Sequence, residues 1–394
     1  MLFVSLNAGI SKHQVALADA MYEVLGNNFV FVEFGQGTGV QYGGFKDDCK
    51  GIDYHEGRPY ILRVQESAEN ESKARKLISE ADAVRTGGEP IVLIKDRLKA
   101  RKLTFRSTER MFKGPFWKDI LRTYYFYKQY IPYANPNYRI LCQSAYNAND
   151  MRLCAGLYKE RCYKFAYFTQ IPQIEIDEVI KKRRKDKIKI VWCARFIDWK
   201  HPEMVLSLAE KMITSGRNNF EIQMIGADTT PLWKQIKTEV EAKDLKNHIL
   251  LTGGLSNIEV QERMRHSHIF IFTSDRGEGW GAVLNEAMGA GCACVASNEI
   301  GSVPYLLKHR ENGLVFKSCS TVSLYENVCS LYDNPQLCEE YGIRAYKTIT
   351  TDWSVQLAAE RLVALSDSIL KGNEINYGDG PCSKAYPTIK ESIL

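Results

Sequence analysis

The chain has 394 residues, 45% of them hydrophobic and 25% charged, and this length predicts two domains of ordinary size rather than one. The formal net charge of +5 is modest and does not indicate a nucleic-acid partner. No apolar run reaches the roughly 18 residues of a membrane-spanning helix, and the run at residues 1–6 is too short for a secretory signal. Eleven scattered cysteines without a Cys-x-x-Cys spacing indicate reduced core residues of a cytoplasmic protein.

Apolar runs of strand length alternate with helical stretches along both halves of the chain. We expect strands at residues 2–6, 29–33, 60–64, 83–86, 138–143, 189–194, 221–225, 249–252, 269–273, 292–296 and 314–316. This alternation is typical of parallel sheets that carry helices on both faces. The sequence therefore predicts an α/β protein with two Rossmann-like, doubly wound domains.

The domain limits follow from composition. We expect a first domain at residues 1–178 and a second at 188–352, joined by a highly charged run at 178–187 that we interpret as a solvated linker. A helix is expected at 353–370, and a loosely ordered tail at 371–394.

The first expected strand is followed by a loop that contains Gly9. Ser11 and Gln14 have the spacing of a capping box, which predicts the start of a helix. A second glycine-rich loop, at residues 35–39, resembles a dinucleotide fingerprint. Val40 stands where the third glycine is required, so a nicotinamide enzyme is not expected.

Residues 95–128 combine eleven Lys and Arg with three acids, and aromatic residues are interleaved among them. Such a stretch could lie on an anionic membrane and reach a lipid-linked acceptor. The alternative is a basic helix pair whose aromatic side chains face the core. Within the stretch, Glu109 and Arg110 follow a short strand-like run at 103–105, so we expect them at the ligand-binding edge of the sheet.

Two carboxylates mark the most informative segment. Glu278 and Glu286 lie eight positions apart across a turn that contains Gly279 and Gly281 and runs into a helix. A strand, a glycine turn and a helix start together can hold an anion. Eight residues at helical rise span roughly 12 Å, so the carboxylates could bind hydroxyls at both ends of a nucleotide sugar. The alternative is an amphipathic helix with two surface glutamates.

Two cations, Arg195 and Lys200, follow the first strand of the second half. Fixed cations stabilise the negative charge that accumulates on a departing diphosphate. Taken alone, they could also be surface cations after a strand. Gly226 and the pair Gly254–Leu255 end the next two expected strands, where a glycine permits close approach of a ligand.

These segments resemble the E-x7-E and G-R-x4-K-G motifs of the family-4 (group 1) retaining glycosyltransferases, which have the GT-B fold. Ala194 and His201 replace the usual glycines of the second motif. The resemblance implies two domains that face across a cleft, with the helix at 353–370 crossing back to the first. It also implies that Arg195 and Lys200 stabilise the leaving diphosphate while Glu278 positions the sugar. The implied donor-binding residues are Gly9, Gly226, Gly254, Leu255, Gly279, Trp280, Gly281 and Glu286.

The first domain would bind the acceptor, and the candidates there are His13, Glu109 and Arg110. A first-turn histidine is often simply solvated, and Glu109 has a salt-bridged loop as its alternative. The family commonly has a histidine in the region of Glu109, but none occurs between His55 and His201. This absence puts a transferred acceptor or base role in doubt.

The function implied is hexosyl transfer from a nucleotide diphosphate sugar to a saccharide or lipid-linked saccharide, in bacterial surface polysaccharide biosynthesis. No cofactor and no metal are expected, because the chain has neither a D-x-D dyad nor a Walker G-K-[ST]. The protein would be cytoplasmic, and peripheral on the inner membrane face if the basic stretch binds lipid. Two alternatives are another GT-B enzyme, such as a nucleotide-sugar 2-epimerase, and a non-catalytic nucleotide-sugar-binding partner.

Overall fold

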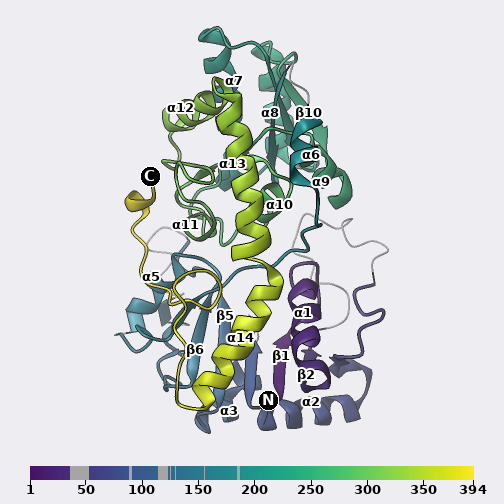
Figure 1. Cartoon of the computed structure of the whole chain (residues 1–394), viewed down its shortest axis with the longest axis vertical. Helices are drawn as coiled ribbons and strands as arrows, with labels where there is room; N and C mark the ends of the chain where they lie inside the picture. The colour runs from purple at the N-terminus through teal and green to yellow at the C-terminus, as the bar shows by residue number, and fades with distance from the viewer. Residues whose placement is uncertain are drawn as a thin grey trace. The chain divides into compact units, whose positions relative to one another are not determined.

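The computed structural model describes residues 1–35, 53–87, 91–113, 123–124, 126–128, 130–154, 156–183 and 187–394. The chain divides into two compact units. Unit 1 consists of Met1–Gln170 and Trp353–Thr388, and unit 2 of Ile171–Asp352 and Ile389–Leu394 (Figure 1). Each unit is built around its own parallel sheet.

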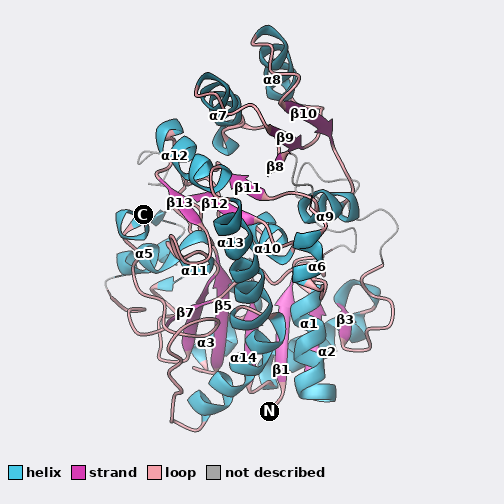
Figure 2. Ribbon diagram, turned by 45° about the horizontal axis from the view of Figure 1, so that its top comes forward, coloured by secondary structure: helices cyan, strands magenta, loops and turns pink. Residues whose placement is uncertain are grey.

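Within the described residues, unit 1 contains a seven-stranded sheet in the order β3-β2-β1-β4-β5-β6-β7. Its strands are β1 (Phe3–Asn7), β2 (Phe29–Glu33), β3 (Ile61–Arg63), β4 (Ala83–Thr86), β5 (Leu103–Thr108), β6 (Tyr138–Cys142) and β7 (Cys162–Lys164). Its helices include α1 (Val15–Leu25), α2 (Ala68–Glu80), α3 (Lys95–Lys99), α5 (Asn147–Met151) and α14 (Val355–Leu370). All of these strand pairs are parallel, and Figure 2 shows helices of unit 1 in front of the sheet.

Burial on both faces of this sheet explains the apolar runs of unit 1. All five residues of β1 are buried. Val4 and Leu6 of β1 belong to a core cluster with Ala74 and Ile78 of α2. Helices α1 and α14 pack against each other (Figure 1). Such strands are largely apolar because both faces of the sheet are covered, although β1 also buries Ser5 and Asn7.

In the described part of unit 2, six strands form a parallel sheet in the order β10-β9-β8-β11-β12-β13. They are β8 (Ile188–Cys193), β9 (Phe220–Ile225), β10 (Ile249–Gly253), β11 (Ile269–Phe272), β12 (Ala293–Ser297) and β13 (Leu314–Phe316). The helices are α6 (Ile176–Lys181), α7 (Glu203–Thr214), α8 (Pro231–Ala242), α9 (Asn257–Arg265), α10 (Val283–Gly289), α11 (Val303–Leu306), α12 (Thr321–Tyr332) and α13 (Pro335–Lys347).

Alternating strand residues divide unit 2 into two packed layers. Ile269 and Ile271 of β11 join a core cluster with Met204 of α7 and Leu324 of α12. Phe270 therefore points to the opposite face of the sheet. In both units the first strand lies in the middle of the sheet, and the chain winds outward in both directions. This is the doubly wound order, so the predicted fold class is confirmed.

Two local predictions differ from the structure. The capping box at Ser11 and Gln14 does not form: α1 begins at Val15, and its N-cap Gln14 makes no capping side-chain bond. The strand-like run at 103–105 is longer, because β5 continues through Thr108. Its second half, Arg106–Thr108, is polar, and Arg106 is buried.

The charged run at 178–187 is not simply a solvated linker. Its start belongs to α6, and Arg183 is buried, donating to the carbonyl oxygens of Gly291 and Ala290 at 2.9 Å. Residues 184–186 lie outside the described residues.

The tail is also ordered, contrary to expectation. Lys384 forms a β-bridge with Tyr163 of β7, and Cys382 is buried. Glu374 pairs with Arg139 at 2.6 Å and with Lys384. These contacts fasten the tail to unit 1 because they satisfy both its backbone and its charges.

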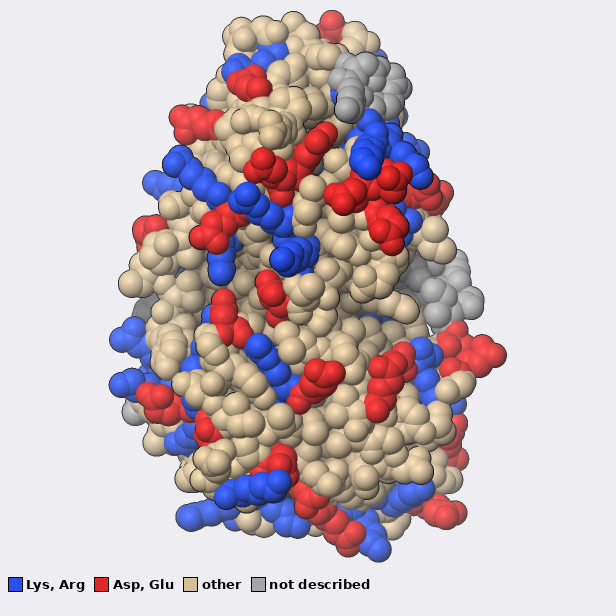
Figure 3. Space-filling model, viewed as in Figure 1, with Lys and Arg blue, Asp and Glu red and all other residues tan. Residues whose placement is uncertain are grey.

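Two composition-based expectations can be compared with the structure. Of the ten free cysteines among the described residues, eight are buried; Cys193 is half-buried and Cys319 is exposed. The expectation of core cysteines is thus confirmed for most of them, while Cys49 lies outside the described residues. A search of the described chain finds no helix of sufficient length and apolarity to span a membrane. On the face drawn in Figure 3, basic and acidic side chains are interspersed.

Candidate functional site

Unit 2 places its ligand-binding edge between β8 and β11. These strands are neighbours, and the chain leaves them toward opposite sides of the sheet. Doubly wound proteins bind ligands at this switch point, outside the carboxyl ends of the strands. The segment after β8 carries Arg195 and Lys200, and the segment after β11 carries Glu278. Topology alone therefore brings these three predicted residues to one edge.

Lys200 and Glu278 are in direct contact. The Lys200 Nζ and Glu278 Oε2 form an ion pair, and the two side chains are 10% and 11% exposed. Ser274 donates its hydroxyl to the same carboxylate oxygen at 3.3 Å. The Lys200 ammonium also lies 4.3 Å from the centroid of the Trp199 ring. A buried charge is tolerated when a partner and hydrogen bonds compensate it, and this arrangement supplies both.

The backbones of the two segments are joined as well. Trp192 of β8 donates its indole N–H to the Thr273 hydroxyl at 2.8 Å, and that hydroxyl donates to the Lys200 carbonyl at 2.6 Å. The Asp275 amide donates to the Trp199 carbonyl at 3.1 Å. Thr273 and Trp192 are both buried, so these bonds are shielded from water. They fix where each segment leaves its strand.

Arg195 is half-buried on the same loop as Lys200. Its guanidinium carbon lies 5.7 Å from the centroid of the Trp199 ring. Trp199 therefore has a cation on either side along the chain and contacts both. An aromatic face attracts cations, so Trp199 helps to gather positive charge at this edge.

His201 adds an ionic bridge that the sequence did not predict. Its Nδ1 lies 2.8 Å from Glu203 Oε1 and its Nε2 lies 3.2 Å from Asp275 Oδ2. Hydrogen bonds that His201 donates to Asp275 and to Glu203 raise its pKa to about 10, against the opposing effect of burial. Burial also disfavours the charged Asp275, but the bonds from His201 and the Gly277 amide prevail and lower its pKa.

Steric contacts explain why glycines occupy the turn after β11. A Cβ on Gly281 would lie 2.6 Å from the Phe272 ring, and its φ of +85° is one that side-chain-bearing residues rarely adopt. At Gly277 a Cβ would come within 3.0 Å of Trp199. Gly279 is buried. These positions keep the turn compact between two aromatic side chains.

The side chain of Trp280 lies in the core of unit 2. The ring is 1% exposed, and its indole N–H donates to Asn285 Oδ1 at 3.0 Å. The prediction for this position concerned backbone amides near Trp280 and Gly281, not the ring. The buried ring anchors that backbone to the start of α10.

Glu286 is half-buried on α10 and accepts a hydrogen bond from the Asn257 amide at 3.2 Å. Asn257 is the first residue of α9, which begins in a capping box formed by Ser256 and Glu259. The α9 start and α10 are thus linked through Glu286. This contact places Glu286 beside the loop that contains Gly254 and Leu255.

The position of Gly226 has no room for a side chain, because the chain leaving β8 lies against it. A Cβ there would lie 2.1 Å from the Ala194 carbonyl oxygen and 3.0 Å from the Phe196 ring. Its amide donates to the Gly253 carbonyl at 3.1 Å, which ties the ends of β9 and β10 together. Gly254 is exposed and Leu255 half-buried on the loop that follows.

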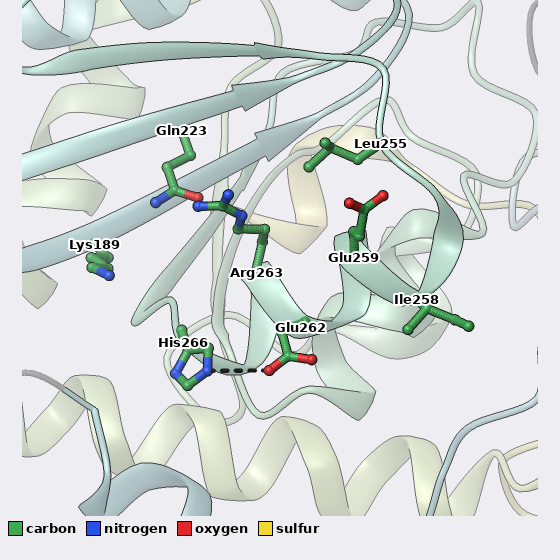
Figure 4. Close-up of a pocket in the computed structure, with 8 residues that line it drawn as sticks. All are labelled: Lys189, Gln223, Leu255, Ile258, Glu259, Glu262, Arg263 and His266. Atoms are coloured by element: carbon green, nitrogen blue, oxygen red, sulfur yellow. Dashed lines mark ion pairs between the residues drawn. The ribbon is translucent and has the colours of Figure 1, made fainter.

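A pocket of about 360 Å³ lies along α9 (Figure 4). Leu255, Ile258 and Arg263 line one side, and Lys189 and Gln223 come from β8 and β9. Lys189 is near the start of its strand, so the pocket extends along the face of the sheet rather than around its carboxyl edge. The Gln223 Oε1 has no partner but is shielded from solvent, so a molecule in the pocket could not reach it without rearrangement.

In unit 1, Gly9 and His13 follow β1. A Cβ on Gly9 would be 3.6 Å from Glu33 Oε1, which is ordinary contact, so the site tolerates a side chain. Glu33 is itself buried at the end of β2 and pairs with His55 at 2.9 Å. Burial, with Lys12 contributing, lowers the pKa of His13 to about 4. His13 is consequently neutral at physiological pH rather than a solvated cation.

Glu109 and Arg110 directly follow β5, as their prediction required. Glu109 pairs with Lys113 at 2.7 Å, and the Arg110 guanidinium carbon is 4.5 Å from the Tyr146 ring centroid. Asn147 donates to the Glu109 carbonyl at 2.5 Å. These contacts fix the conformation of the loop. Glu109 forms the salt bridge that the sequence left open as the alternative to acceptor binding.

The basic, aromatic stretch at 95–128 is partly interior. Arg97 is buried and donates to the carbonyl oxygens of Ile78, Ala81, Asp82 and Leu103 and to the Thr104 hydroxyl. Its desolvation lowers its pKa to about 10. Phe126 is buried, whereas Tyr124 is 55% exposed. Residues 114–122 and 125 lie outside the described residues, so the expected surface can be followed only at its ends.

Sequence reasoning missed His201, Asp275 and Thr273 as site residues. His201 was noted only as a replacement for glycine, and its position immediately after Lys200 was the available signal. Across the described ranges, no group of three or more His, Cys, Asp or Glu is arranged to hold a metal ion. Metal independence stays a prediction.

Comparison with known proteins supports a sugar-transferring class. Residues 173–348, which lie within unit 2, match the family model "Glycosyl transferases group 1". An uncharacterized glycosyltransferase of Methanocaldococcus jannaschii is 25% identical over 49% of this chain and 48% of its own length. Alpha-D-kanosaminyltransferase of Streptomyces kanamyceticus is 21% identical over 55% of this chain and 57% of its own. The chain thus spans about half the length of the curated relatives it matches.

Solved structures show the same fold over nearly the whole chain. Anabaena HepE in complex with UDP has a TM-score of 0.67 at 13% identity, covering 94% of this chain and 100% of that one. A glycosyltransferase from Rickettsia africae has a TM-score of 0.66 at 14% identity, with coverage of 94% and 98%. At such low identity the likeness establishes the fold, which is GT-B.

Proposed function

We propose that the protein transfers a hexosyl unit from a nucleotide diphosphate sugar to a saccharide or lipid-linked saccharide, with retention of anomeric configuration. The observation that carries the proposal is the group at the switch point of unit 2, where Lys200 contacts Glu278 and Arg195 shares the Lys200 loop. Cations beside a carboxylate complement a diphosphate joined to a hydroxyl-bearing sugar. The group 1 family match and the relatives' names support the same reaction class.

The residues then have separate tasks. Arg195 and Lys200 stabilise the diphosphate, whose negative charge grows as the anomeric carbon–oxygen bond breaks and its electron pair moves to phosphate. Glu278 accepts hydrogen bonds from sugar hydroxyls. The backbone amides of Gly279, Trp280 and Gly281 bind phosphate or sugar oxygens. Glu286 binds the ribose hydroxyls.

The remaining donor contacts come from backbone at strand ends. Gly226 lets the end of β9 approach the β8 loop, and Gly254 and Leu255 border the nucleobase. Gly9, after β1 of unit 1, is retained as a donor-binding candidate on the resemblance alone. We assign no metal or other cofactor, because Arg195 and Lys200 supply the positive charge that a divalent cation would otherwise provide.

The acceptor is assigned to unit 1, with His13, Glu109 and Arg110 as candidate contacts. A hydroxyl oxygen of the acceptor forms the new bond to the anomeric carbon, and its proton passes to an oxygen of the leaving phosphate. Neutral His13 can donate or accept a hydrogen bond without adding charge. We place the reaction in bacterial surface polysaccharide biosynthesis, on the inner face of the cell membrane.

Sugar-labelled UDP-, GDP- and ADP-hexoses, with and without a saccharide acceptor, test the proposal. Transfer of label to the acceptor together with release of nucleoside diphosphate is expected for one nucleotide. Conversion of the donor to an epimer without acceptor would instead indicate a 2-epimerase. Binding without any chemical change would indicate a non-catalytic binding protein.

A further inference from the structure

His201 joins three segments of unit 2. It directly follows Lys200, and its ring contacts Glu203 at the start of α7 and Asp275 after β11. The Cys319 sulfur, before α12, lies 3.6 Å from its Nε2. The resembling motif has a glycine at this position, so it assigns the imidazole no task.

The backbone at His201 is in an unfavourable region for this residue. Its φ of 50° and ψ of 55° are left-handed, where a Cβ crowds the following carbonyl. Glycine would adopt these angles without strain. A histidine at a strained position implies that its side chain contributes something that glycine cannot.

The His201 side chain contacts the turn before Glu278 through Asp275. One carboxylate oxygen of Asp275 contacts His201, and the other accepts the Gly277 amide at 2.7 Å. The Asp275 carbonyl accepts the Glu278 amide at 3.0 Å. The imidazole therefore holds the residue that shapes the turn leading to Glu278.

We infer that His201 is a positioning residue for sugar transfer, which ties the Lys200 segment to the Glu278 turn and keeps the two charged groups in register. The inference rests on the proposed function. A small misplacement of reacting groups can lower a rate by about two orders of magnitude. Positioning of this kind lowers kcat more than it weakens donor binding, because ground-state contacts are less demanding than those in the transition state.

The charge on His201 makes the tie stronger than a neutral bond. Asp275, Glu203 and Cys319 face the ring from three different segments, and Lys200 adjoins it in the chain. Bonds to the two carboxylates raise the pKa of His201 to about 10. His201 and Asp275 are thus both charged at neutral pH, and charge-assisted bonds are shorter and stronger than neutral ones.

The test compares His201→Gly with Asp244→Gly. Asp244 also has a left-handed φ, 52°, but it lies after α8 and not in the segments that carry Lys200 or Glu278. Both substitutions relieve backbone strain, but His201→Gly also removes the bridge to Asp275 and Glu203. At neutral pH Asp244→Gly should therefore melt at or above the wild-type temperature, and His201→Gly should melt below it. Only His201→Gly should lower kcat, by about tenfold or more, with the donor KM changed less than threefold. Amide hydrogen exchange at Gly277 and Glu278 should accelerate in the same variant alone.

A second variant, His201→Asn, keeps an N–H donor and tolerates left-handed backbone. We expect its kcat to lie between those of wild type and His201→Gly. Wild-type kcat and exchange in both His201 variants would overturn the inference. If wild type transfers no sugar from any nucleotide, the proposed function fails, whereas the exchange measurement still decides whether His201 holds the turn.

Discussion

Lys200 and Glu278 form a shielded ion pair across 78 positions of sequence, joining the loops that follow two neighbouring strands. Each of these buried charges is compensated by the other. We therefore expect Lys200→Met, which leaves the Glu278 carboxylate without its partner, to lower the free energy of unfolding by about 3–5 kcal/mol. Adding Glu278→Gln removes the stranded carboxylate charge and should recover most of the loss. Urea unfolding of the two single variants and the double variant measures the coupling. Simply additive losses would mean that the pair does not stabilise the fold.

Arg195 allows a cleaner test of catalysis. It is half-buried, so Arg195→Ala should leave folding nearly intact. Turnover should fall by roughly 10²–10³, the usual effect of losing one preorganised charge stabiliser. The measurement is kcat at saturating donor. The matched control is Arg217→Ala, because Arg217 forms a surface ion pair with Asp333. A folded Arg195→Ala enzyme with the wild-type rate would remove this residue from the mechanism.

The raised pKa of His201 predicts a pH dependence of stability. The stability that charged His201 contributes to the folded protein is complete below pH 6.5, the ordinary pKa of a histidine. It is lost as the pH rises through about 10, because the folded protein then releases the proton that the unfolded chain has already lost. The difference in melting temperature between wild type and His201→Gly should therefore narrow between pH 6.5 and 10. Both proteins should carry Cys319→Ser, because that thiol also faces the ring and its contact with His201 is thereby removed from the comparison. A difference independent of pH would show that the imidazole is not charged in the folded protein.

The basic ends of residues 95–128 predict reversible membrane binding. Lys99, Arg101 and Lys102 are exposed, and each cation near an anionic bilayer contributes about 1 kcal/mol before screening. Their reversal to glutamate should release the protein from anionic vesicles at low salt while leaving nucleotide binding unchanged. Reversal of Lys234 and Lys237 on α8 is the control. Wild type that stays in the supernatant with anionic vesicles at low salt would favour a soluble acceptor.

Much of the fold could be read from hydrophobic runs. The limits of β2, β4 and β13 agree with their predictions to the residue, although β4 contains Arg85 and Thr86 besides its two apolar residues. β7 was missed. It has only three residues and is held between β6 and the bridge to Lys384, a contact that no local pattern encodes.

The site was predictable to a different degree. Spacing after strands predicted that Lys200, Glu278 and Arg195 lie together, and the structure places all three at one edge of the sheet. It could not predict that Lys200 contacts Glu278, since the pairing depends on the positions of both loops. For the same reason, the link between His201 and Asp275 became visible only in three dimensions.

The central claim is that the switch point of unit 2 holds a nucleotide sugar with its sugar toward Glu278 and its ribose toward Glu286. Calorimetric titration of UDP into wild type, Glu278→Gln and Glu286→Gln tests it most directly, with GDP and ADP titrated in the same way. One nucleoside diphosphate should bind wild type with 1:1 stoichiometry and bind Glu286→Gln about tenfold more weakly, since one lost charged contact is worth roughly 1.4 kcal/mol or more. Glu278→Gln should bind it nearly as well as wild type and fail in sugar transfer. Absence of binding to wild type, or equal losses in both variants, would contradict the account.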